Sequence, residues 1–120
     1  MIFIVEQEAQ HFLSWYDRLY ELNTPYGIFP FSHGLWQSAD ITSHNITSRL
    51  AIINMIHEAK GLDTYEKTKE KFLLHHDYQS IAILEHNYQE EIVHVSKGLK
   101  WFQYCYSIDF PNHSIDDTIR

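Results

Sequence analysis

Apolar residues recur every three to four positions over long stretches of this chain, and this spacing restricts the fold more than any other feature. Between Ile2 and Leu22 the repeating apolar residues are Ile4, Val5, Phe12, Trp15, Leu19 and Leu22. A helix turns by about 100° per residue, so these side chains gather on one face and the pattern predicts a helix. Asn23-Thr24-Pro25 follows directly and predicts its end.

The same spacing predicts three further helices. They cover residues 45–60, which are apolar nearly all round, residues 63–74, which are short and charged, and residues 78–107, which form the longest stretch. Gly61 is expected to cap the 45–60 helix at its C-terminus. Asp63 and Glu66 have capping-box spacing for the short helix that follows. The predicted fold class is therefore all-α.

Two segments lack helical periodicity. Residues 25–44 contain prolines and glycines among aromatic side chains, so they are expected to form a long loop that packs on the body of the protein. The tail over 112–120 is expected to fray. No internal repeat is found apart from the short motif described below.

Size, charge and cysteine content narrow the class of protein. The 120 residues, of which 44% are hydrophobic, suit a single domain over 1–120. The net charge of -7 and the scattered positions of the nine Lys and Arg residues argue against general nucleic-acid binding. No apolar run reaches the roughly 20 residues that span a bilayer, so no membrane partner is expected. Cys105 is the only cysteine, which favours a reducing, cytoplasmic setting.

Two copies of the motif Glu-x-x-His carry the chemistry of the sequence. They are Glu8 with His11 and Glu91 with His94, and each pair lies within about one turn of a predicted helix. Carboxylate oxygen and imidazole nitrogen together suit a first-row metal ion. Glu8 falls within an apolar stripe, where an ionised carboxylate is costly unless it is paired or bound to metal. We therefore expect a metal site rather than a chance match, with Gly98 leaving room beside His94.

Glu58 is the best candidate for a third carboxylate ligand, because it lies on the most apolar helix; the alternative is a helix-end charge. His57 and Glu58 also begin a His-Glu-x-x-His zinc motif, but Gly61 occupies the position of the second histidine. The zinc-protease interpretation fails for that reason. Glu85 and Glu90 are expected to face solvent beside the second motif.

The residues around these motifs resemble those of a known family. The matching stretches, in chain order, are Glu8-Ala9-Gln10-His11-Phe12, Ser32-His33-Gly34-Leu35-Trp36, Arg49-Leu50-Ala51, His57-Glu58-Ala59-Lys60-Gly61-Leu62-Asp63, Glu90-Glu91-Ile92-Val93-His94-Val95 and Trp101-Phe102. They cover nearly the whole chain and resemble a ferritin-like family catalogued as domain of unknown function 455. The resemblance implies a four-helix bundle with a carboxylate-bridged dinuclear centre, distantly similar to the di-iron hydroxylase that modifies a hypermodified adenosine in transfer RNA.

By that resemblance, Glu8 and His11 hold one metal ion, Glu91 and His94 hold the other, and Glu58 assists. The implied cofactors are two iron ions, or manganese. Family members begin with a further helix that supplies another carboxylate, and this chain starts within what corresponds to the next helix. We therefore expect a truncated ferritin-like bundle of three long helices and one short helix. A second copy of the chain that completes the bundle is the expected partner.

One function and two alternatives follow. The first is a non-haem di-iron oxidoreductase that uses oxygen to oxidise or hydroxylate an unidentified small molecule or modified nucleoside. The second is a catalytically inactive, truncated remnant or interaction scaffold. The third is metal storage, which ranks last because no feature of the sequence indicates a cage-forming surface. Tyr88, one turn before Glu91, is expected to pack in the core, with a redox role as the alternative.

Overall fold

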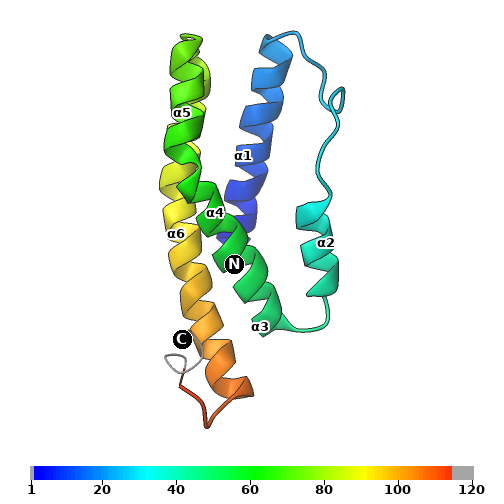
Figure 1. The fold of residues 1–120 in the computed structure, drawn as a ribbon, viewed down its shortest axis with the longest axis vertical. Helices are drawn as coiled ribbons and strands as arrows, with labels where there is room; N and C mark the ends of the chain where they lie inside the picture. The colour runs from blue at the N-terminus through cyan, green and yellow to red at the C-terminus, as the bar shows by residue number, and fades with distance from the viewer. Residues whose placement is uncertain (1, 115–120) are drawn as a thin grey trace. The chain divides into compact units, whose positions relative to one another are not determined.

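A computed structural model describes residues 2–114, and this part of the chain is all-helical and contains no strand, as the sequence predicts (Figure 1). The elements, in order, are α1 (Ile2–Glu21), α2 (Gly34–Ile41), α3 (Ile46–Arg49), the π-helix η1 (Leu50–His57), α4 (Glu58–Asp63), α5 (Tyr65–Leu74) and α6 (Tyr78–Asp109). The predicted fraying tail lies largely outside the described residues. The chain divides into two compact units, Met1–Ser32 with Leu62–Ile92, and His33–Gly61 with Val93–Arg120.

The first unit consists of α1, α5 and the first part of α6, which lie side by side (Figure 1). Trp15 on α1 stacks on Phe72 of α5, with the ring centroids 5.9 Å apart. Ile4 of α1 and Ile81 of α6 are buried, as is the polar side chain of His11. Ile4 and Trp15 of the apolar stripe predicted for the first helix therefore face the other helices of this unit, whereas Val5, Phe12 and Leu22 of that stripe are exposed.

Two helices of the first unit end in the same way. Asn23 adopts a φ of 55°, and the Thr24 amide donates to the Leu19 carbonyl at 2.9 Å. His76 adopts a φ of 54°, and the Asp77 amide donates to the carbonyl five residues earlier. Both ends are Schellman motifs, in which a left-handed residue lets the chain turn back onto the last carbonyls. Asparagine tolerates the left-handed conformation better than most residues. The predicted end of the first helix at Asn23 is confirmed.

The second unit contains α2, α3, η1, the first part of α4 and the second part of α6. The Asn45 side chain accepts a hydrogen bond from the Ser48 amide at 2.7 Å and so caps α3. The Thr47 hydroxyl donates to Asp109 at 2.6 Å, and Leu50 is only 2% exposed. These contacts hold the start of this helical segment against the end of α6.

The structure corrects the predicted boundaries in this middle part of the chain. The helix expected over 45–60 is three elements, since eight of its residues form a π-helix in which the Glu58 amide donates to the Ile53 carbonyl, five positions back. Gly61 lies inside α4 instead of capping it. α2 lies inside the segment 25–44 that was predicted to be a loop. A segment that is apolar all round carries no periodicity that separates α from π geometry, and a helix of two turns gives a weak pattern.

The start of α5 also differs from the capping-box prediction. Asp63 is the last residue of α4, and α5 begins at Tyr65 after Thr64, whose side chain does not cap the helix. Within the described residues, no helix is both long enough and apolar enough to cross a membrane.

Candidate metal centre

Glu8 of α1 and Glu91 of α6 bring their carboxylates together, and His94 lies one turn beyond Glu91 on the same continuous helix. One ligand atom from each of these three residues lies within 4.8 Å of the other two. The His94 side chain is fully buried, whereas that of Glu8 is 48% exposed. Three of the five ligands expected from the sequence therefore form a group that could hold a metal ion.

His11 lies beside this group and contacts three carboxylates. Its Nε2 atom lies 2.7 Å from Oε2 of Glu90, and its Nδ1 atom lies 3.1 Å from Oε1 of Glu91 and 3.8 Å from Oε2 of Glu8. A carboxylate only accepts hydrogen bonds, so the short contact with Glu90 requires a proton on Nε2. Nδ1 is then the nitrogen that faces the candidate centre. Without a proton, this nitrogen could bind a metal ion.

Glu90 is the site residue that the sequence interpretation missed. It was expected to face solvent, but its side chain is only 24% exposed and bonds to His11 across 79 positions of sequence. Desolvation, the largest single influence, raises the pKa of Glu90, yet hydrogen bonds with His11 and Gln7 outweigh it, so the pKa lies below 4.5. The ionised carboxylate therefore fixes the orientation of the imidazole. Its adjacency to Glu91 was the only signal available in the sequence.

Glu58 lies in the second unit, at the first residue of α4. Its Oε1 atom accepts a hydrogen bond from the side-chain amide of Asn54 at 3.2 Å, and its Oε2 atom is buried from solvent. The neighbouring His57 pairs with the Ser38 hydroxyl at 3.0 Å. His57 and Glu58, the two residues of the failed zinc motif, thus have different partners. Glu58 lies at a helix end, as the alternative interpretation expected, but that interpretation does not explain why its Oε2 atom is buried.

Tyr88 and Glu85 behave largely as the sequence predicts. The Tyr88 ring stacks on Tyr65 of α5, with the centroids 4.0 Å apart and the ring planes 23° apart. Glu85 is 48% exposed and pairs with Lys69 at 2.6 Å. Tyr88 is half-buried, and its stacked ring agrees with the packing role expected for it.

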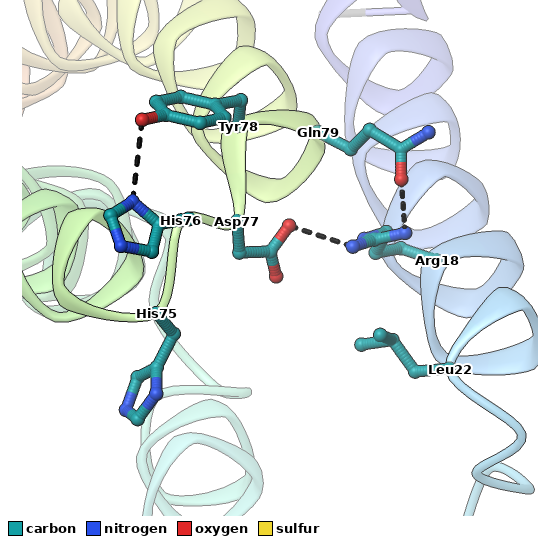
Figure 2. Close-up of a pocket in the computed structure, with 7 residues that line it drawn as sticks. All are labelled: Arg18, Leu22, His75, His76, Asp77, Tyr78 and Gln79. Atoms are coloured by element: carbon teal, nitrogen blue, oxygen red, sulfur yellow. Dashed lines mark hydrogen bonds and ion pairs between the residues drawn. The ribbon is translucent and has the colours of Figure 1, made fainter.

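A separate pocket of about 440 Å³ lies in the first unit, where the end of α1 meets the turn between α5 and α6 (Figure 2). Arg18 donates from four of its five N–H groups to Asp77, Ser80, Gln79 and Glu21. The guanidinium is therefore engaged by partners within the protein. This network fixes α1 against the start of α6.

Asp77 is the centre of that network. Its carboxylate accepts hydrogen bonds from the Ser80 hydroxyl at 2.6 Å and from the Ser80 amide at 3.0 Å, and so caps α6. The Ser80 hydroxyl is the largest influence on the pKa of Asp77, followed by the Ser80 amide, and the Arg18 guanidinium adds to both. Together they hold this pKa below 3.8. The capped start of α6 sets the position of Glu90 and Glu91 farther along the helix.

The comparisons agree with the family suggested by the motifs. A family model described as "Protein of unknown function (DUF455)" matches residues 1–113. An uncharacterized protein of Haemophilus influenzae is 33% identical over 99 residues, which are 82% of this chain and 34% of that protein. The chain thus spans about a third of the length of this relative. No solved structure matches.

Proposed function

This chain belongs to the DUF455 family of proteins of unknown function, and we propose that it is a ferritin-like dimetal carboxylate protein that binds iron or manganese. One observation carries the proposal: ligand atoms of Glu8, Glu91 and His94 lie within 4.8 Å of one another. Carboxylates and imidazole are a donor set that suits iron and manganese, and a Glu-x-x-His pair on each of two helices is the arrangement of dimetal carboxylate bundles.

Each ligand has a distinct role in this proposal. Glu8 and Glu91 supply negative charge on facing helices, which offsets the charge of divalent ions. His11 supplies Nδ1, because Glu90 holds its Nε2 proton. His94 lies in a fully buried position from which water is excluded, and Glu58 contributes a further carboxylate.

The proposed activity is the oxygen-dependent oxidation or hydroxylation of an unidentified small molecule or modified nucleoside. Bound iron would supply the oxygen chemistry, and the protein supplies charge balance and a fixed ligand geometry. Glu90 keeps His11 oriented, and the buried side of the site limits access of water. Orientation of His11 and exclusion of water are the two contributions that these side chains make to the proposed activity.

The test is the metal content of the purified protein. We expect about two metal ions per chain by elemental mass spectrometry, and a new visible absorption after ferrous iron and air are added. Glu91→Ala should lose the metal with its helical circular dichroism unchanged. Glu85→Ala, which removes an exposed carboxylate from the same helix, is the matched control and should keep the metal. A wild-type chain without bound metal would favour the inactive scaffold instead.

A second copy of this chain is the partner that we propose. One side of α1, which we call its outer face, carries exposed apolar residues in a three-four repeat, namely Ile2, Val5, Ala9, Phe12 and Tyr16. Two of these rings, Phe12 and Tyr16, also contact the ring of Tyr26. Val5 is 67% exposed, and Phe12 and Tyr16 are 48% and 44% exposed. Such a repeat is typical of a helix that packs against another helix. Dimetal carboxylate bundles draw a carboxylate from each of four helices, and the described candidates Glu8, Glu58 and Glu91 come from three, so a second chain could supply the fourth.

A further inference from the structure

Asn54 and Gly98 bring two backbones into close approach within the second unit. A Cβ atom built on Gly98 would lie 2.8 Å from Cβ of Asn54 and 3.1 Å from its carbonyl oxygen. Real Cβ atoms do not approach other atoms this closely, so only glycine fits at this point of α6. The sequence suggested that Gly98 leaves room beside His94, and the structure shows that Asn54 fills the space at Gly98.

The register of these two segments follows from two contacts. Thr47 bonds to Asp109, and seven positions later Asn54 lies against Gly98, eleven positions earlier on α6. The two segments therefore run antiparallel. Four residues beyond Asn54 is Glu58, and four residues before Gly98 is His94, so Glu58 lies near the level of His94.

The Asn54 amide fixes the carboxylate at that level. Its Nδ2 atom donates to Oε1 of Glu58 at 3.2 Å, while Oε2 of Glu58 is buried. Both residues belong to the turn in which η1 passes into α4, and π-helical turns often occur at functional sites. A carboxylate that must bind a metal ion requires an oriented side chain, and the hydrogen bond from Asn54 restricts the orientation of Glu58.

We propose that Asn54 is a positioning residue for a metal ligand: it holds Glu58 in the orientation in which this carboxylate binds a metal ion together with His94, and Gly98 allows the required approach. The proposal rests on the dimetal function proposed above. It differs from a packing role for Asn54, because a packing role predicts an effect on stability alone.

The test compares two variants that each lose one hydrogen bond between or within helices of the second unit. Asn54→Ala keeps Cβ but removes the amide, and Thr47→Val removes the bond to Asp109 without affecting Glu58. Asn54→Leu, which has nearly the shape of asparagine, replaces Asn54→Ala if that variant folds poorly. Cobalt(II) titration followed by visible absorption gives the affinity and reports ligand geometry, and thermal melts report stability.

We expect cobalt to bind about 10- to 100-fold more weakly to Asn54→Ala with a changed spectrum, and normally to Thr47→Val. Wild-type affinity in Asn54→Ala and Asn54→Leu, or an equal loss in Thr47→Val, would overturn the positioning role. In that case a loss of binding in Glu91→Ala would still leave the dimetal function standing. A wild-type chain that binds no cobalt would overturn both proposals together.

Discussion

Nε2 of His11 lies 2.7 Å from Oε2 of Glu90, although the two residues are 79 positions apart in the chain. This contact leaves Nδ1 of the same ring 3.1 Å from Glu91 and 3.8 Å from Glu8. The His11 ring therefore contacts the orienting carboxylate of Glu90 through Nε2 and faces the candidate ligands Glu91 and Glu8 through Nδ1. Proteins commonly orient metal-binding histidines in this way, through a carboxylate that never touches the metal.

Replacing Glu90 should weaken metal binding without removing a ligand. We expect Glu90→Ala to lower cobalt affinity about 10- to 100-fold, because His11 loses the acceptor that fixes its orientation. Glu90→Gln keeps an oxygen that accepts from Nε2 and should fall between this variant and the wild type. Isothermal titration of cobalt into the three proteins checks the order. Unchanged affinity in Glu90→Ala would contradict the orienting role.

Asp77 should make stability depend on pH in acid. Its folded pKa lies below 3.8, so its ionised form stabilises the native state fully above about pH 3.8, and this contribution is lost as the pH falls through the lowered pKa. Asp77→Asn keeps a capping oxygen but removes the charge. Urea unfolding should therefore show a gap between wild type and variant that is constant near neutral pH and closes in acid. A gap that is equal at every pH would rule out this linkage.

Two glycines should respond in opposite ways to the same substitution. Gly61 lies in α4 with no atom within 4 Å of a built Cβ, so Gly61→Ala should stabilise the protein by about 0.5–1 kcal/mol through helix propensity. Gly98→Ala would place a Cβ 2.8 Å from Asn54 and should destabilise by about 1–3 kcal/mol. Thermal or urea unfolding measures both. Stabilisation by Gly98→Ala would show that the two segments separate easily.

The outer face of α1 should mediate self-association. We expect the wild type to be dimeric by light scattering. Val5→Glu should raise the dimer dissociation constant at least about tenfold, because it buries a charge in the interface between the two copies of α1. Gln10→Glu adds the same charge to an exposed position outside the repeat and should leave the dimer intact. A wild type that remains monomeric at high concentration would exclude the second copy as partner.

The sequence by itself determined the two longest helices and most of the candidate ligands. Apolar spacing predicted α1 and α6 to within two residues, and the left-handed Asn23 explains why the first prediction ended correctly. The Glu-x-x-His pairs pointed to Glu8, Glu91 and His94, since residues three apart on a helix share a side whatever the tertiary structure. Local geometry of this kind depends on the chain's own periodicity alone.

Only the tertiary structure decided the partners of those side chains. Glu90 bonds to His11, and Asn54 lies against Gly98, although neither contact has a sequence pattern. The π-helix could not be predicted from the sequence either, because nearly all its residues are apolar and their spacing fits any helical period. Contacts between helices depend on which faces pack together and on the level at which the helices meet. The spacing of apolar residues within a single helix determines neither.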